Sequence, residues 1–326
     1  HALLQTARAG RRAERRAAEE LTARLWPKLF AWHRWLVTHR DPAGSGLLSV
    51  VHSWESGMDN SARWDTPYRA VRPTAALPPF TRLDRDLVAD GAQRPSDLEY
   101  RRYLWLIEQL RAVRYDADDV VRTSSFLVAD VFFTAIFVAA SEVLTELGEQ
   151  TGQPPEQLEL LRGWARRGAG ALPETVAAEY GLARDRDLRT GGWLATRTIA
   201  GFAPLLCGGL SPADEHAMLA VLDGPQWAGH PGLFSRVPPS TSPRDPGFRT
   251  REYWRGPVWP VITWLFWWAF RRRGWDDRAA TLRAESLRQL GDGTFAEYYH
   301  PFTGEPLGSR HQSWTAAVTL DWLANP

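Results

Sequence analysis

Apolar residues recur every three to four positions over most of the chain, which is the spacing of amphipathic helices. The longest such pattern covers residues 11–40 and stops at the turn sequence RDPAGSG. The most apolar pattern covers residues 124–152, so this helix is expected inside the protein. The remaining predicted helices cover residues 95–115, 154–172, 199–208, 211–223, 256–274, 276–291 and 311–324. Strand patterns are few, and the chain is predicted to be an all-α protein of about nine helices.

Two long connections separate these helices. Residues 41–94 and 223–255 are rich in Pro and also contain Gly, Trp and Asp residues. Long structured loops in a compact domain usually carry function. No Ser/Gly-rich linker or low-complexity stretch divides the chain, so residues 1–326 are expected to form a single domain. We expect a helical scaffold whose polar and aromatic loops gather at one end.

The net charge and the cysteine content limit which partners and which kinds of site the protein can have. The net charge of +1 indicates neither a nucleic acid nor an acidic membrane partner. The Arg-rich start is expected to be a solvated helix face, with a basic docking arm as the alternative. A single cysteine, Cys207, excludes an internal disulfide and a multi-cysteine metal site, and it is expected to be buried. No apolar run is expected to be long enough to span a membrane, and the most apolar, VITWLFWWAF, is too short. We expect a cytoplasmic protein that uses no metal or cofactor. Assembly into a homo-oligomer is left as an open alternative.

Tryptophan is strongly enriched, and one tryptophan-rich loop also holds acids. The chain has 17 Trp residues, whereas typical proteins carry about one per hundred residues. In WESGMDNSARWD, residues 54–65, the acids Glu55, Asp59 and Asp65 lie beside Trp54 and Trp64. Asp59 could cap a short helix. The alternative is a site that uses an acid on a polar, ring-shaped ligand, because Trp stacks well on the apolar face of a sugar.

Two further segments place charges among aromatic residues: YWRGPVWP at 253–260 and FAEYYHPFTGEPLGSRHQSW at 295–314. An acid in an aromatic pocket holds its proton more tightly and can serve as a general acid near neutral pH. Glu297 could instead pair with Arg310, and Arg255 could be a buried packing arginine. Neither a GxSxG elbow, an HExxH pair nor a glycine-rich phosphate loop occurs in the sequence.

Together, ESGMDNSARWD, YWRGPVWP and FAEYYHPFTGEPLGSRHQSWTAA resemble the signature blocks of glycoside hydrolase family 63. The resemblance covers roughly residues 50–326, with the blocks in the family's order. The segment RPSDLEY and the compact size look most like the bacterial glucosylglycerate and mannosylglycerate hydrolases. The resemblance implies an (α/α)6 toroid and hydrolysis with inversion at the sugar carbon.

Residue roles follow from the same resemblance. Asp59 would be the general acid and Glu297 the general base, facing each other across about 6.5–9.5 Å with a water between them. Arg94 would bind a substrate carboxylate through bidentate hydrogen bonds, assisted by Tyr100. The alternative for Arg94 is a solvated arginine beside a helix. The residues implied in sugar binding are Trp54, Gly57, Tyr253, Trp254, Trp259 and Gln312.

Two departures from the family pattern accompany this reading. Thr263 stands where the family commonly has Asn. The predicted helices fall short of a complete toroid, so the fold is expected to be incomplete at its N-terminal side, with the native N-terminus preceding His1. We expect an inverting α-glycosidase acting on 2-O-α-glucosylglycerate. The alternatives are a mannosylglycerate hydrolase or another α-glucosidase of the family, and, in another class, a non-catalytic sugar-binding or interaction fragment.

Overall fold

The computed structural model describes residues 1–291 and 293–325, and helices dominate these ranges. The α-helices are α1 Ala2–Ala9, α2 Arg12–His39, α3 Asp65–Ala70, α4 Leu83–Asp86, α5 Asp97–Ala112, α6 Ala117–Thr123, α7 Val131–Gln150, α8 Pro155–Ala171, α9 Pro212–Asp223, α10 Pro260–Arg272, α11 Asp276–Leu290 and α12 Ser313–Ala324. Short 3₁₀ helices cover Ser53–Ser56, Ala62–Trp64, Gly91–Gln93, Pro173–Thr175, Ile199–Leu206 and Tyr253–Arg255. The prediction of a mainly helical protein is therefore confirmed.

The strands are all two residues long. They are β1 Ser49–Val50, β2 Val128–Ala129, β3 Val176–Ala177, β4 Leu182–Ala183, β5 Arg186–Asp187, β6 Tyr298–Tyr299 and β7 Pro306–Leu307. They form three small antiparallel sheets with the orders β1-β2-β5, β3-β4 and β6-β7. In the first sheet Val50 is opposite Val128, and Val128 is opposite Asp187. This sheet ties the long loop after α2 to the start of α7.

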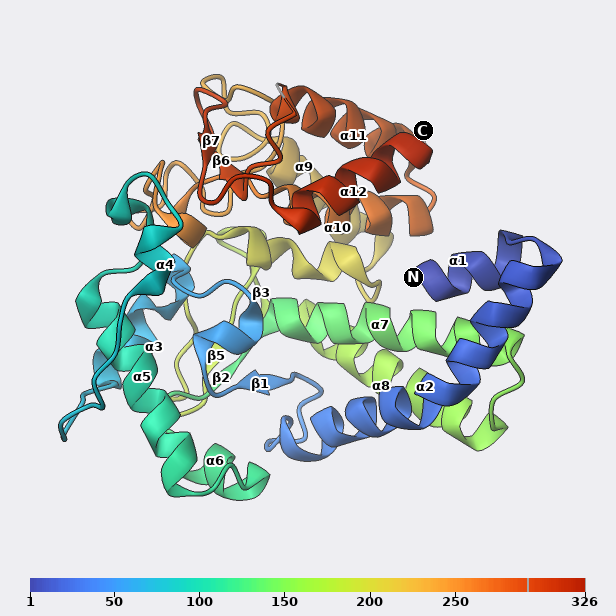
Figure 1. Cartoon of the computed structure of the whole chain (residues 1–326), viewed down its shortest axis with the longest axis horizontal. Helices are drawn as coiled ribbons and strands as arrows, with labels where there is room; N and C mark the ends of the chain where they lie inside the picture. Colours follow the sequence, from blue (N-terminus) through green and yellow to red (C-terminus); the bar gives the residue numbers. More distant parts are fainter. Residues whose placement is uncertain (292, 326) are drawn as a thin grey trace.

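Helix α7 runs through the middle of the molecule (Figure 1). It packs closely against α8 and the 3₁₀ helix Ile199–Leu206, while α10 packs against α11 and α12. By length and composition α7 could cross a membrane, a test that the core helix of a soluble protein also passes, and 72% of its most apolar window is buried inside the protein. The sequence prediction that no apolar run is long enough was therefore wrong, whereas the expected interior position of this helix is confirmed.

Some element boundaries differ from the sequence prediction for clear physical reasons. The pattern over residues 124–152 becomes helical only at Val131, because the Asp130 side chain caps the helix by accepting hydrogen bonds from the backbone N–H of Phe132 and Phe133. Residues before it pair as β2. The segment Ile199–Leu206 forms a 3₁₀ helix that contains Pro204, which has no backbone N–H. The short helices α3 and α4 lie in the connection that was expected to be a loop.

The two long connections meet, as expected, at one end of the helical scaffold. The side-chain oxygen of Asn60 accepts a hydrogen bond from the Trp254 backbone N–H at 3.0 Å. Its amide donates to Glu252 at 3.1 Å. In Figure 1 the segments around α3, α4, α5, β6 and β7 gather at the left of the molecule. The loops that hold the three aromatic motifs are thereby brought together.

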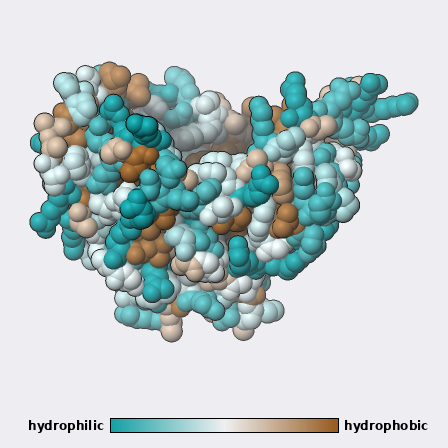
Figure 2. Space-filling model, turned by 90° about the horizontal axis from the view of Figure 1, so that it is seen from below, coloured by the Kyte–Doolittle hydropathy of each residue, from teal (hydrophilic) through white to brown (hydrophobic). Residues whose placement is uncertain are grey.

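The Arg-rich start of the chain forms a charged helix surface. Arg11 pairs with Glu14, and Arg16 pairs with Glu20, on exposed turns of α2. The face of the molecule drawn in Figure 2 is mainly hydrophilic, with smaller apolar patches between polar side chains. The two exposed ion pairs on α2 support the solvated helix face expected from the sequence.

Candidate active site

The three acids of the loop 54–65 have different environments. Glu55 accepts a hydrogen bond from the Arg40 guanidinium at 2.5 Å. Asp65 accepts two from Arg255, at 2.8 and 2.7 Å. Within residues 1–291 and 293–325, the carboxyl of Asp59 takes part in no ion pair. Two of the acids therefore hold the loop in place through arginines, whereas Asp59 has no ion partner among the described residues.

A buried ion cluster fixes this loop against the core. Nη1 of Arg63 donates to Asp130 at 2.7 Å and to both carboxylate oxygens of Asp185 at 3.2 Å. The cation and the two acids are each less than 5% exposed. Since Asp130 also caps α7 and Asp185 accepts from the Val131 N–H, the loop is joined to the first turn of the central helix. The position of Asp59 thus depends on the folded core.

The Asp59 carboxyl holds its proton unusually tightly. Burial raises its pKa from the ordinary 3.8 to about 7; the Arg94 cation opposes this shift and the Glu297 charge adds to it. An acid that is half protonated near pH 7 can donate a proton at neutral pH. The electrostatic influence of both residues also means that Asp59, Arg94 and Glu297 share one site.

Glu297 is buried in a set of directed hydrogen bonds. Only 4% of it is exposed. Oε2 accepts from Arg94 Nη2 at 2.6 Å, from the Ser309 N–H at 3.0 Å and from the Ser309 hydroxyl at 3.2 Å, while Oε1 accepts from Arg94 Nη1 at 3.3 Å. Gly308 (φ +71°) makes this possible, since a Cβ there would lie 2.6 Å from Oε2. The partner of Glu297 is therefore Arg94, and the alternative pairing with Arg310 is wrong.

Aromatic rings surround this ion pair. The Arg94 guanidinium lies 4.5 Å from the centre of the Tyr253 ring. Trp254 and Trp259 stack with centroids 3.6 Å apart and are 3% and 2% exposed, so they offer little surface to a ligand in this conformation. Tyr298 packs against Trp259 at 4.7 Å. The aromatic groups hold the site in a water-poor environment, which explains the tight burial of its charges.

A second aromatic group lies on the Asp59 side of the site. Trp54 is 37% exposed and packs near Tyr100, at 6.1 Å, and Tyr103, at 5.7 Å. Burial lowers the pKa of His52 to about 4, so its imidazole is neutral when it accepts from the Trp54 N–H. Gly57 adopts φ +71° and ends the 3₁₀ helix that carries Trp54. Trp54 is thus fixed in place with part of its surface free for a ligand.

Several other sequence alternatives are resolved by the structure. Ser61, not Asp59, occupies the cap position of the 3₁₀ helix Ala62–Trp64, so the capping role considered for Asp59 is wrong. Arg255 is 8% exposed and paired, which confirms it as a buried packing arginine. Cys207 is buried as expected. Thr263 donates to the Trp259 carbonyl at 3.1 Å, a bond within its own helix that its hydroxyl can make.

Sequence reasoning missed Ser309, which fixes the Glu297 carboxylate. The Gln312 amide donates to the Ser309 hydroxyl at 3.1 Å, so Gln312 is connected to Glu297 through this serine. The signal was present, because Ser309 lies inside the same polar block as Glu297 and directly follows Gly308. Gln93 was missed as well; its side-chain oxygen accepts from the Gly308 N–H at 2.9 Å.

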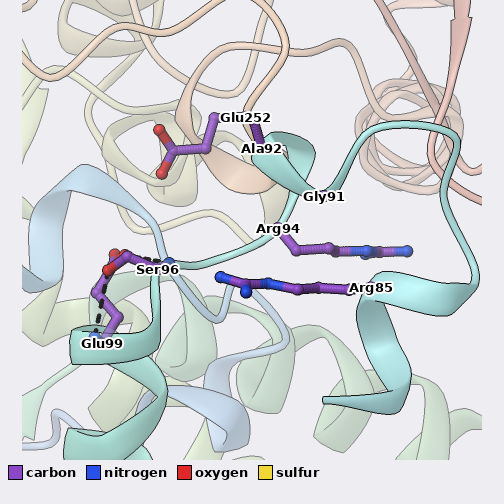
Figure 3. A pocket seen from close by; sticks show the side chains of 7 residues that line it. All are labelled: Arg85, Gly91, Ala92, Arg94, Ser96, Glu99 and Glu252. Carbon is purple, nitrogen blue, oxygen red and sulfur yellow. Dashed lines mark hydrogen bonds between the residues drawn. The ribbon is translucent and has the colours of Figure 1, made fainter.

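A pocket opens beside Arg94 (Figure 3). Its volume is about 490 Å³, and it is lined by Arg85, Gly91, Ala92, Arg94, Ser96, Glu99 and Glu252. Figure 3 shows the side chains of Arg85 and Arg94 lying alongside each other. The lining combines two arginines with two acids, Glu99 and Glu252, and a guanidinium can form paired hydrogen bonds with a carboxylate. Across the described part of the chain, no group of three or more His, Cys, Asp or Glu residues could hold a metal ion.

Comparisons with known proteins identify the family of the chain. The mannosylglycerate hydrolase MGH1-like glycoside hydrolase domain matches residues 2–315. The glucosylglycerate hydrolase of Mycolicibacterium hassiacum is 53% identical over 98% of this chain and 72% of its own length. The mannosylglycerate hydrolase MGH1 of Selaginella moellendorffii is 38% identical over 93% of this chain, which spans only 60% of that relative.

The similarity extends to solved structures. The structure of the mannosylglycerate hydrolase from Thermus thermophilus with Tris superimposes with a TM-score of 0.85 at 39% identity, covering 95% of this chain and 72% of that one. The same enzyme with Tris and D-glycerate gives a TM-score of 0.87 at 37% identity, covering 96% and 73%. Both structures are described as members of family GH63.

Proposed function

The chain belongs to the MGH1-like glycoside hydrolases of family 63, and we propose that it hydrolyses 2-O-α-glucosylglycerate to glucose and glycerate. The observation that carries this proposal is the environment of Asp59. Its pKa is raised to about 7 in a site shared with the carboxylate of Glu297. A protonated acid and an ionised acid in one site are what glycoside hydrolysis requires.

The proposed mechanism is inversion in a single displacement. Asp59 protonates the glycosidic oxygen as the bond to the sugar carbon breaks. A water attacks the opposite face of the sugar, and Glu297 takes its proton. The buried negative charge of Glu297 also stabilises the positive charge that develops on the sugar ring. Ser309 supports this role, since its two hydrogen bonds hold one oxygen of the carboxylate.

We assign the glucose subsite to the aromatic residues around the two acids. The half-free Trp54 is positioned to stack on a sugar ring, with Gly57 leaving room beside it. Tyr253 lies on the other side, and the buried, stacked pair Trp254 and Trp259 supports it from behind.

We assign the glycerate carboxylate to Arg94, assisted by Tyr100, and we assign Gln312, which contacts Ser309 beside Glu297, to the sugar hydroxyls. Support comes from the pocket that Arg94 lines and from the relatives, whose names specify glycerate glycosides. The Thermus thermophilus relative is described in complex with D-glycerate. The two guanidinium groups of the pocket supply the positive charge that a carboxylate needs.

Mannosylglycerate is the second candidate substrate. The mannosylglycerate hydrolase of Thermus thermophilus is 39% identical over 91% of this chain, below the 53% of the glucosylglycerate enzyme. The difference in identity favours glucose. We further propose a single catalytic domain built on an (α/α)6 toroid, in a cytoplasmic enzyme that acts on a small soluble glycoside.

The test is to incubate the protein with glucosylglycerate and, separately, with mannosylglycerate, and to measure the free sugar released. We expect the glucoside to have the higher kcat/KM. A higher value for the mannoside would reverse the assignment of substrate. Binding of either glycoside without release of sugar would instead favour a non-catalytic sugar-binding fragment.

A further inference from the structure

In this conformation the carboxylate of Glu297, the proposed base, already accepts several hydrogen bonds. Four donors are directed at the Glu297 carboxylate, two from the Arg94 guanidinium and two from Ser309. An ionised carboxylate offers about four lone-pair sites. To act as a general base, it must accept a proton from a water held at hydrogen-bond distance. A donor must therefore leave before the base can work fully.

The donors are unevenly distributed between the two oxygens. Three of them converge on Oε2, and Arg94 Nη1 alone reaches Oε1, at 3.3 Å. Ser309 sits in the same loop as Glu297, whereas Arg94 belongs to a distant part of the sequence, at the edge of the pocket. Oε1 is thus the oxygen suited to take the proton of water, and Arg94 is the group that covers it.

We propose that the carboxylate of the substrate draws Arg94 away from Glu297, so that a glycoside with an anionic aglycone frees the base and a neutral one leaves it paired. This inference rests on the proposed function. In this proposal the ion pair between Arg94 and Glu297 forms in the resting enzyme, and the correct substrate separates it.

The exchange costs less than a simple separation, because Arg94 keeps an anionic partner throughout and Glu297 keeps its two hydrogen bonds from Ser309. A neutral ligand would separate a buried guanidinium from a buried carboxylate without replacing either partner, which is strongly unfavourable. Nε of Arg94 is buried and has no hydrogen-bond partner among the described residues, so it is available to an incoming carboxylate. The Tyr253 ring, 4.5 Å from the guanidinium, can stabilise the cation while its partner changes.

The exchange predicts that the charge of the aglycone acts on turnover as well as on affinity. Free glycerate should therefore activate the hydrolysis of a substrate that lacks an aglycone. α-D-Glucosyl fluoride is such a substrate: water adds to the sugar carbon, fluoride leaves, and Glu297 accepts the proton of the water. The products are glucose, fluoride and one proton.

The experiment measures fluoride release from α-D-glucosyl fluoride by the wild-type chain, with and without D-glycerate. A freed general base contributes about 10²–10⁴-fold, so we expect glycerate to raise kcat by about tenfold or more. Glycerol at the same concentration, which lacks the carboxylate, should have no such effect. Inhibition by glycerate, or an unchanged rate, would overturn the proposal.

Arg94→Ala removes the donor that covers Glu297, so without glycerate it should hydrolyse the fluoride faster than the unactivated wild type, and glycerate should leave its rate unchanged. Retained activation in this variant would contradict the exchange. Arg251→Ala is the matched control, because Arg251 forms a bidentate pair with Glu305 that is exposed; it should keep the activation. If Arg94→Ala does not fold, the wild-type comparison decides alone. Failure of the proposed function would look different, as the wild type would not cleave glucosylglycerate.

Discussion

The guanidinium of Arg94 lies on the carboxylate of Glu297, with Nη2 2.6 Å from Oε2, and both side chains are less than a tenth exposed. The pair joins the segment before α5, which contains Arg94, to the loop before β6, which contains Glu297. Removal of one member of a buried ion pair leaves an unpaired charge, whereas the intact pair contributes little net stability. The pair is therefore better explained by the site that it builds than by stability.

Replacement of Asp59 by Asn should remove the proton donor and retain the shape of the side chain. We expect kcat on glucosylglycerate to fall by about 10²–10⁴-fold. Asp118→Asn is a suitable control, because Asp118 is an exposed carboxylate that contacts His39 and does not line the pocket. It should keep nearly full activity. Wild-type turnover by Asp59→Asn would rule out the acid role.

The same variant should be more stable than the wild type above neutral pH. Because burial raises the pKa of Asp59 to about 7, the folded protein keeps a proton that the unfolded chain loses near pH 4. Stability from this group therefore falls as pH rises from about 4 to 7. At pH 8, Asp59→Asn should raise the free energy of unfolding by about 2–4 kcal/mol, measured by urea denaturation. No gain at pH 8 would show that the charged form is not disfavoured.

Activity should depend on the protonated form of Asp59. Since its pKa is about 7, the fraction able to donate a proton falls tenfold per pH unit above that value. We expect kcat/KM for glucosylglycerate to be maintained just below pH 7 and to fall above it. A profile measured from pH 5 to 9 checks this directly. A rate that keeps rising to pH 9 would exclude Asp59 as the acid.

Arg94→Ala should raise KM for glucosylglycerate by about 10- to 100-fold, because hydrogen bonds to a charged group contribute about 1.5–3 kcal/mol. KM for a neutral α-glucoside should change little. Steady-state kinetics on the two substrates separate the effects. An equal rise in KM for both substrates would show that Arg94 does not bind the substrate carboxylate and would indicate a general effect on the site.

Arg63→Ala should destabilise the protein strongly, because it leaves Asp130 and Asp185 buried without their cation. The loss of one partner of a buried ion pair costs about 3–5 kcal/mol. Urea denaturation would measure it. Arg16→Ala removes an exposed pair with Glu20 and should change stability by less than about 1 kcal/mol. A loss at Arg63 no larger than at Arg16 would contradict the anchoring role of the cluster.

The sequence predicted the long helices because their apolar periodicity is set by one face that packs against the core, as α2 shows over Arg12–His39. In the structure the side chains of Ser96 and Ser211 cap α5 and α9, each accepting a backbone hydrogen bond from the first turn of its helix. The start of α7 at Val131 was missed, since it depends on pairing of β2 with β1 and β5, which are distant in sequence.

The site was predictable to the level of residue types, whereas the partners of those residues were not. Aromatic acid-bearing motifs indicated Asp59 and Glu297, and the resemblance gave them roles. No local pattern could assign Arg94 to Glu297, because the two lie on segments far apart in the chain. The bond from Ser309 likewise depends on the turn at Gly308, whose φ of +71° becomes evident only in the folded loop.

The central claim is that Asp59 and Glu297 act from opposite faces of the sugar, with a water beside the base. The most direct test is ¹H NMR of glucosylglycerate hydrolysis, observed before the glucose anomers equilibrate. An α-linked substrate cleaved with inversion should release β-glucose first. Initial release of α-glucose would mean retention, which needs the carboxyl groups only about 5–5.5 Å apart, and would contradict the account.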